Sequence, residues 1–310
     1  MLPIDQKLSI PEIAEQFGII HASNKEADGA YLSKVYIIND KYIIRGRPYS
    51  PSTIHNFGRE IKLIEEVRRL IEYQLPSLIP ASNTELYCVN GNVFYTVYPL
   101  LAGKNICTWY DLEKASDDQT AVILAAQRDI HTQTIGHFPK ETSPPQSFVQ
   151  ITSRKFKHIE DKLMDVSRER ISKALQVVQN HTQGCTSGDL CFVHGDFHHG
   201  NVLFDGQSTV SGIIDLDRSR IGHYLEDFAF TFMVLQRIYA SNEYIFDEKK
   251  LRKLLQWYKF SPEDMDLLIE YWILYIFSDY YVMVTEDPLP NSELYMEYQK
   301  SYLDTICKKF

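Results

Sequence analysis

Apolar residues recur along the first hundred positions with two different periods. The runs 31–38 and 41–46 are rich in β-branched and aromatic residues and flank a polar turn, which predicts a hairpin. A second hairpin is predicted around the strong turn pair Asn90-Gly91. Between the two hairpins, apolar residues of the segment 52–74 recur every three to four positions, as on a helix. A small sheet with a helix packed against it is therefore expected.

The remainder of the chain has the apolar spacing of helices. Helices are predicted at 120–133, over one continuous stretch at 156–181, and from Leu225 to the end. A third hairpin, with an Asp-Gly turn, is predicted at 201–217, and a short helix is expected near the start at 8–19. These elements predict an α+β fold.

The change of character near residue 98 predicts two lobes. Residues 1–98 would form a small β-rich lobe, and residues 99–310 a larger, mostly helical one. A chain of 310 residues is long enough for each lobe to bury its own core.

Composition and charge exclude several classes of protein. The net charge of −9 does not suit binding to a nucleic-acid backbone, which requires clustered Lys and Arg. The five cysteines form no C-x-x-C pair, so neither a zinc knuckle nor a disulfide framework is indicated. The strongest apolar run, 271–277, is far shorter than the roughly 20 residues that a membrane span needs. A cytoplasmic protein without membrane or nucleic-acid partners is expected. The sequence does not indicate its oligomeric state.

Candidate chemistry is concentrated in the stretch FVHGDFHHGNVLF, residues 192–204. Asp196 and Asn201 lie in this stretch, and the hairpin that follows would return Asp215 to the side of Asn201. A carboxylate and an amide oxygen are hard ligands that suit Mg²⁺. Asp196 would then be free to orient or deprotonate a hydroxyl, which is the division of roles that phosphoryl transfer requires.

Two segments carry a resemblance to a known family. HGDFHHGN resembles the H-G-D-x-x-x-x-N catalytic loop of the aminoglycoside phosphotransferase and choline kinase superfamily, and GIIDLDRSRIGHYLEDFA resembles the segment that follows it there. The resemblance implies a two-lobed protein-kinase-like fold, with a nucleotide-binding first lobe and a catalytic, substrate-binding second lobe. It also implies an enzyme that transfers the γ-phosphoryl of ATP or GTP, with Mg²⁺, to a hydroxyl of a small molecule.

The resemblance gives a role to each residue that matches the motif. Asp196 would be the catalytic aspartate, and Asn201 and Asp215 would bind the metal. His194 would support the loop by hydrogen bonding, and Asp227 would brace it. Asp217 would serve either as a second acid or as a strand-end residue that faces water.

The nucleotide lobe matches the family through a basic strand residue and a helical glutamate. Arg45 is favoured as the basic residue, although strand alternation places Arg47 on the same face. Glu60 is expected to pair with Arg45, with Glu65 and Glu66 of the same helix as competing partners. The backbone around Tyr98–Leu100 corresponds to the hinge that would bind a purine edge, whereas the phosphate-covering loop holds only one glycine, Gly29.

The acceptor is expected to be cationic. Trp272, Tyr275 and Asp279 recur at spacings of three and four and would share one helix face, although such aromatic residues are also common in cores. An aromatic and acidic face suits an amine or quaternary ammonium. The hypothesis is an amino sugar ahead of choline.

Two other functions compete with the kinase interpretation. His194, Asp196, His198 and His199 have the close spacing of two-metal hydrolase ligands, but their order differs from the common pattern. A non-catalytic, kinase-like nucleotide-binding protein is the other alternative. The joint presence of Asp196, Asn201 and Asp215 argues against it.

Overall fold

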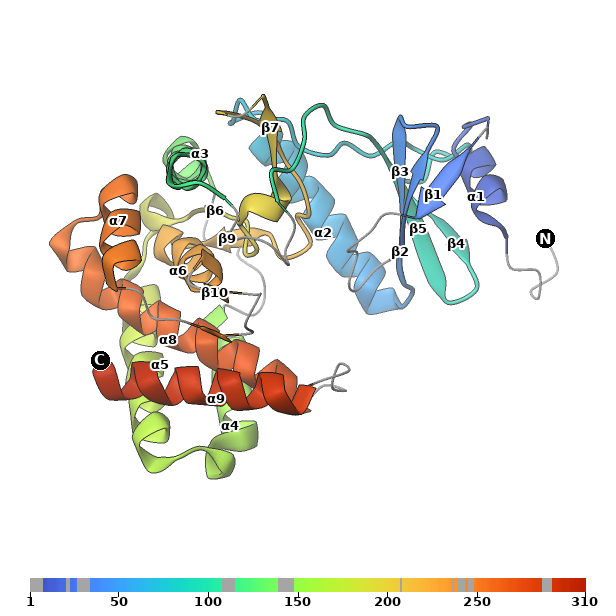
Figure 1. Cartoon of the computed structure of the whole chain (residues 1–310). Helices are drawn as coiled ribbons and strands as arrows, with labels where there is room; N and C mark the ends of the chain where they lie inside the picture. Colours follow the sequence, from blue (N-terminus) through green and yellow to red (C-terminus); the bar gives the residue numbers. More distant parts are fainter. Residues whose placement is uncertain are drawn as a thin grey trace.

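A five-stranded antiparallel sheet occupies the first third of the chain in the computed structural model (Figure 1). Its strand order is β1-β2-β3-β5-β4. The strands are β1 (Asn24–Glu26), β2 (Lys34–Ile38), β3 (Tyr42–Pro48), β4 (Cys88–Asn90) and β5 (Val93–Pro99). The structure describes residues 8–20, 23–26, 34–107, 115–138, 148–206, 208–235, 237–238, 243–244, 248–285 and 292–310. Gly29, residues 31–33 of the first predicted strand and residues 141–147 lie outside the described residues.

Both hairpins predicted in this sheet are confirmed. The β2–β3 turn is made by Asn39 and Asp40, whose φ angles of 54° and 51° lie in the left-handed region that Asn and Asp tolerate. The β4–β5 turn contains Gly91 at φ 64°. The register Val35↔Arg45 and Arg45↔Thr96 makes β3 a central strand, so its side chains are held from both sides.

Two helices accompany the sheet. Helix α1 (Ile10–Gln16) begins at Ser9, whose side chain forms a capping box with Glu12. Helix α2 (Pro51–Arg68) begins at Ser50 and ends six residues before the predicted limit at 74. Figure 1 shows α2 between the sheet and the strands of the second lobe.

The second lobe is mostly helical, as predicted. Its helices are α3 (Asp117–Thr134), α4 (Phe148–Ile159), α5 (Asp165–Gly184), α6 (Tyr224–Leu235), α7 (Glu248–Tyr258), α8 (Pro262–Thr285) and α9 (Ser292–Lys309). Two short antiparallel strand pairs interrupt them, β6 (Cys191–Val193) with β9 (Arg220–Gly222), and β7 (Val202–Asp205) with β8 (Thr209–Ile213). Within the described residues, no helix is long and apolar enough to span a membrane.

Two helix predictions in this lobe are wrong. The expected single helix at 156–181 is broken, because α4 ends at Ile159, a short 3₁₀ turn covers 160–162, and α5 begins at Asp165. Ile159 and Leu163 are both buried in the main core, and the break lets α4 and α5 each pack against α8. The region after Leu225 is not purely helical either, since β10 (Arg237–Ile238) pairs with β11 (Glu243–Tyr244).

The core of the second lobe surrounds α6 and α8. Every residue of α6 from Leu225 to Leu235 is buried, and α8 crosses it with Tyr271 to Phe277 all buried. A second apolar cluster joins β6, β7 and β8 to the C-terminal half of α2. The two strand pairs that hold the candidate site therefore rest on a packed, largely rigid base.

Candidate active site

The loop between β6 and β7 carries Asp196 and Asn201. Strand β6 ends at Val193, a 3₁₀ turn covers His199–Asn201, and β7 continues from Val202. The Asn201 amide nitrogen donates to the carbonyl of Asp196 at 2.9 Å, so the two ends of the loop are tied across their five-residue separation. This bond leaves the amide oxygen of Asn201 as an acceptor.

Asp215 lies beside Asn201, as the hairpin predicted. The amide N–H of Ile214 donates to the Asn201 carbonyl at 2.9 Å, and Val202 is paired with Ile213. Asp215 has a φ of 61°, a left-handed conformation that is uncommon for a residue with a side chain. Such strain is often found at functional sites, where the surrounding structure enforces it.

His194 joins the β6–β7 loop to the residue that follows β8. Its Nε2 lies 3.0 Å from the carbonyl of Ile214, and its Nδ1 accepts a hydrogen bond from the backbone N–H of Asp196 at 3.2 Å. Both ring nitrogens are therefore engaged. The ring is buried, and its position supports the loop rather than a metal ion.

Asp227, at the start of α6, holds the backbone of the loop from below. Its carboxylate accepts hydrogen bonds from the N–H groups of His194 (3.0 Å) and Gly195 (2.7 Å) and from His131 Nε2 (3.0 Å). Burial raises the pKa of Asp227, but the bonds from His131 and Gly195 and the charge of nearby histidines outweigh burial and bring the pKa to about 2. The carboxylate is thus charged and fully partnered.

His131 also belongs to this network, although it was not among the residues predicted from the sequence. Its Nδ1 is 2.7 Å from the hydroxyl of Tyr258, so a chain of hydrogen bonds runs from Tyr258 through His131 to Asp227. The only local signal is a histidine on the buried face of α3, and its partners lie 96 and 127 residues away.

Gly195 is required at its position by both conformation and space. Its φ is 77°, and an added Cβ would lie 2.6 Å from the guanidinium of Arg220 and 2.7 Å from the carbonyl of Arg218. Arg220 is fixed there by an ion pair with Glu226 and by a 2.7 Å hydrogen bond to the Tyr275 hydroxyl. Burial raises the pKa of Glu226, whereas the charge of Arg220 acts to lower it.

Asp196 has the environment of a proton acceptor. Its side chain is 20% exposed. Burial raises its pKa to about 6, while the positive charge of Arg218 acts in the opposite direction. A carboxylate poised in this range can accept a proton from a hydroxyl near neutral pH.

The other loop histidines serve the loop itself. His198 Nδ1 accepts from the Gly200 N–H at 3.0 Å, and its Nε2 lies 3.2 Å from the amide nitrogen of Asn201. His199 Nε2 lies 3.1 Å from the Thr120 hydroxyl. Burial lowers the pKa of both imidazoles to about 3, so both are neutral. Across the described ranges, the ligand atoms of these histidines and Asp196 do not converge as a two-metal hydrolase requires.

Two arginines of β3 reach across to the acidic residues of the second lobe. Arg45 contacts Asp215 at 3.1 Å and Asp217 at 2.7 Å. Arg47 lies 3.4 Å from Asp217 and is packed against the ring of Phe57, 5.3 Å from its centroid. Both arginines share one face of the strand, as alternation requires.

The expected pairing of Arg45 with Glu60 is wrong. Glu60 forms its ion pair with Arg47, at 2.9 and 3.3 Å, and Arg47 also donates to the Tyr98 hydroxyl at 3.1 Å. Arg45 cannot take this position, because its guanidinium is already bound by Asp215 and Asp217. Burial raises the pKa of Glu60, and the charge of Arg47 opposes this.

The predicted hinge needs a correction at Leu100. Its N–H donates to the carbonyl of Lys41 at 2.7 Å, which extends the β3–β5 pairing and leaves this donor unavailable to a purine. A base would have to use other backbone groups of the connection 100–104. That connection is fixed to the second lobe, because Lys104 and Phe204 exchange backbone hydrogen bonds.

The predicted acceptor face is also wrong in part. Trp272 is 1% exposed and packs against Phe232, so it belongs to the core. Tyr275 is 8% exposed and stacks on Phe148 at a centroid distance of 4.2 Å. Asp279 lies on the same helix and is half-buried. Trp272 and Tyr275 do share one face of α8, as their spacing predicted, but this face packs against α4 and α6.

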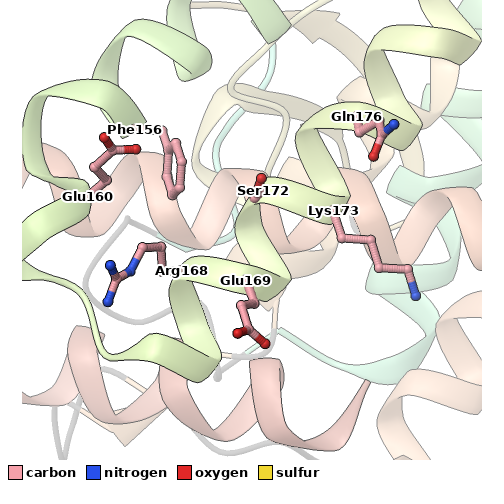
Figure 2. Close-up of a pocket in the computed structure, with 7 residues that line it drawn as sticks. All are labelled: Phe156, Glu160, Arg168, Glu169, Ser172, Lys173 and Gln176. Atoms are coloured by element: carbon pink, nitrogen blue, oxygen red, sulfur yellow. The ribbon is translucent and has the colours of Figure 1, made fainter.

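A separate hollow of about 470 Å³ lies on the outer surface of α4 and α5 (Figure 2). Acidic and basic side chains alternate around it. It is lined by Phe156, Glu160, Arg168, Glu169, Ser172, Lys173 and Gln176. Since no predicted site residue contributes to it, the hollow is not part of the candidate active site.

The sheet, the hinge connection and the helical second lobe, with Asp196, Asn201 and Asp215 at their junction, define a two-lobed kinase-like protein. A family model described as "Phosphotransferase enzyme family" matches residues 25–266. The chain belongs to this family, and the predictions of a kinase-like fold and a small-molecule kinase are confirmed. No curated protein matches the chain.

Solved structures show the same fold at low sequence identity. The GDP and kanamycin complex of APH(2")-IIia is 16% identical with a TM-score of 0.69, over 96% of this chain and 97% of that one. Spectinomycin phosphotransferase APH(9)-Ia, with ADP and spectinomycin, is 13% identical with a TM-score of 0.61, over 96% and 94%. An aminoglycoside phosphotransferase from Alicyclobacillus acidocaldarius is 11% identical with a TM-score of 0.63, over 99% and 95%.

Proposed function

We propose that this enzyme transfers the γ-phosphoryl group of ATP or GTP to a hydroxyl of a cationic small molecule, with an amino sugar favoured over choline. The observation that carries the proposal is the convergence of Asp196, Asn201 and Asp215 at the ends of one loop and one hairpin. Structural neighbours in complex with GDP or ADP support a nucleotide co-substrate.

The donor atoms of this site fit Mg²⁺. The amide oxygen of Asn201 and the carboxylate of Asp215 are hard ligands, and Asp215 is 41% exposed, which leaves room for water and phosphate oxygens. Asp217, at 33% exposure, adds negative charge next to them. When bound, Mg²⁺ would neutralise charge on the β- and γ-phosphates.

The protein's own residues supply positioning and proton transfer. Asp196 orients the acceptor hydroxyl and accepts its proton, because its carboxylate has a pKa near 6 and sits on a loop held by Asp227. Arg47, rather than Arg45, is the better candidate to contact phosphate, since Glu60 and Tyr98 hold its guanidinium in place. Arg45 instead forms ion pairs with Asp215 and Asp217.

The cationic acceptor is supported by charge. The chain carries a net charge of −9, and Asp196, Asp215 and Asp217 gather at the junction of the lobes. Two structural neighbours, one in complex with kanamycin and one with spectinomycin, also support a cationic acceptor. Asp279 remains the proposed acceptor contact on α8, whereas Trp272 and Tyr275 are both buried.

A coupled nucleotide-consumption assay tests the proposal. The panel holds kanamycin, spectinomycin, choline, ethanolamine, thiamine, methylthioribose, homoserine and a neutral macrolide, each with ATP or GTP and Mg²⁺. Turnover is expected only with cationic acceptors and is expected to be lost in Asp196→Ala. Turnover confined to an uncharged acceptor would overturn the acceptor class, as would an unchanged acceptor KM in Asp279→Asn. Nucleotide binding without turnover on any acceptor would favour the non-catalytic alternative.

A further inference from the structure

Two histidines and a cysteine meet on the side of the second lobe away from Asp196. His181 is on the last turn of α5, Cys185 follows that helix directly, and His223 lies between β9 and α6. One ligand atom from each residue lies within 4.8 Å of the other two. Among the described residues, this is the one group of three His, Cys, Asp or Glu side chains that meets this criterion.

The separation between the donors of His181 and Cys185 matches that of a tetrahedral zinc site. His181 Nε2 lies 3.5 Å from Cys185 Sγ. With a Zn–S bond of about 2.3 Å and a Zn–N bond of about 2.0–2.1 Å, tetrahedral geometry places these atoms about 3.6 Å apart. His181 and Cys185 are four residues apart, one helical turn, so the α5 backbone sets this separation. The ring of His223 meets that of His181 edge-on, with centroids 4.5 Å apart.

The surroundings favour a cation. Cys185 is 7% exposed and His223 8% exposed, so these two donors are shielded from water. The carboxylates of Asp189 and Asp264 lie near both imidazoles and add negative charge around the three donors. Both carboxylates are held in place, Asp189 by the N–H and hydroxyl of Thr186 and Asp264 by Tyr224 and Ser261.

We propose that His181, Cys185 and His223 bind one Zn²⁺ ion, with a water molecule in the fourth position. Two imidazoles and a thiolate are the borderline-soft donors that zinc prefers. The His223 Nδ1 accepts a 3.4 Å hydrogen bond from the Leu225 N–H, which leaves Nε2 for the metal. Binding releases the thiol proton of Cys185 to solvent, and no oxidation or reduction is involved.

Such an ion would stabilise the pairing of β6 with β9, the two strands next to the loop that carries Asp196. Cys191 is paired with Gly222 at one end of β6–β9, and Val193 with Arg220 at the other. Cys185 precedes β6 by a short 3₁₀ turn (Ser187–Asp189) and His223 directly follows Gly222, so the ion would lie at the end of the strand pair opposite Asp196. Because the ion would lie at the end of the strand pair opposite Asp196, its binding does not depend on the phosphotransferase mechanism.

Metal titration of the full chain tests this site. Protein purified and stripped with a chelator is titrated with Zn²⁺ against a chromophoric competitor, and separately with Co²⁺. One equivalent of Zn²⁺ is expected to bind and to raise the apparent Tm, and Co²⁺ is expected to give a thiolate-to-metal charge-transfer band. Cys185→Ser and His181→Gln should each lose affinity by about 100-fold or more. His181 is half-buried at a helix end, so its variant is expected to fold even if His223→Gln does not.

Matched controls identify the site. Cys88→Ser and His55→Gln remove the same side-chain types from the first lobe, where Cys88 is half-buried and His55 exposed, and both should bind like the parent protein. The charge-transfer band distinguishes this site from Mg²⁺ ligands such as Asp215, which contain no sulfur. Equal Zn²⁺ affinity in the parent and Cys185→Ser proteins, or a band that persists in Cys185→Ser, would overturn the proposal.

Discussion

Replacing Asp196 with asparagine should abolish most activity and at the same time stabilise the folded protein. The amide has nearly the same shape as the carboxylate but cannot accept the proton of the acceptor hydroxyl. Turnover should therefore fall by ~10²-fold or more, with little change in nucleotide affinity. The gain in stability follows from burial, because the amide removes a charge from a site that is only 20% exposed.

The size of this gain can be worked out from the pKa of Asp196. Burial raises it from 3.8 to about 6 in the folded protein. A shift of roughly two units corresponds to about 3 kcal/mol at neutral pH, where the aspartate is ionised in both folded and unfolded states. For a chain of this size, the change corresponds to an increase in apparent Tm of about 3 to 6 °C.

The raised pKa of Asp196 determines how the stability of the folded protein changes with pH. Because the folded-state pKa is raised, the folded protein binds the proton more tightly, and ionisation of Asp196 destabilises the fold. The penalty is complete above about pH 6 and disappears as the pH falls through 6 toward 3.8. The same ionisation should appear as the acid limb of the profile of kcat/KM against pH, with activity lost below about pH 6.

The assay compares thermal unfolding of the parent and Asp196→Asn proteins between pH 4 and pH 8. The difference in apparent Tm should be largest at pH 7–8 and close to zero at pH 4. Asp205→Asn is the control, since Asp205 is exposed at the β7–β8 turn and its variant makes the same change in net charge. A Tm difference that does not vary with pH, or a variant no more stable than the parent at pH 7, would refute the argument from burial.

Three further predictions concern the metal, the phosphates and the loop. Asp215→Ala should weaken Mg²⁺-nucleotide binding about 10-fold or more in calorimetric titrations, and an unchanged Mg²⁺ dependence would transfer the role to Asp217. Arg47→Lys should raise the nucleotide KM about tenfold by losing the fork geometry, whereas an equal or larger effect of Arg45→Lys would reverse this assignment. His131→Ala should cost about 1.5–3 kcal/mol in urea unfolding by removing a donor to buried Asp227. An unchanged midpoint would mean that the other donors suffice.

Local signals in the sequence identified most of the fold. The hairpins were predictable because their turns contain Asn39-Asp40 and Asn90-Gly91, residues that tolerate the left-handed backbone found there. The break between α4 and α5 was not predictable, because the segment holds no Gly or Pro and its helical spacing continues through the break. The break accompanies the packing of α4 and α5 against α8, a helix distant in the sequence, and no local pattern encodes those contacts.

In the candidate site too, residues placed by local structure were predictable, whereas contacts between residues far apart in the sequence were not. Asp196, Asn201 and Asp215 were predictable because a short loop and one hairpin determine their spacing. The choice of Arg47 as the partner of Glu60 was not, because both arginines share a strand face and only the contacts of Arg45 with the second lobe separate them. His131 and Tyr258 join the site through contacts more than 90 residues apart in sequence, which no local pattern encodes.

The packing of helix α2 has a consequence for fragments and chimeras of this protein. Near its start, Phe57 packs against Phe94 of the sheet, whereas Ile64 and Val67 lie in the apolar cluster formed with β6, β7 and β8. A fragment ending at residue 98 would expose those apolar side chains to water, at a cost on the order of 2 kcal/mol for each. We therefore expect such a fragment to self-associate. An exchange of first lobes between relatives must therefore match the apolar side chains in the C-terminal half of α2 to the strand pairs of the new second lobe, although the chain itself crosses between the lobes only after β5.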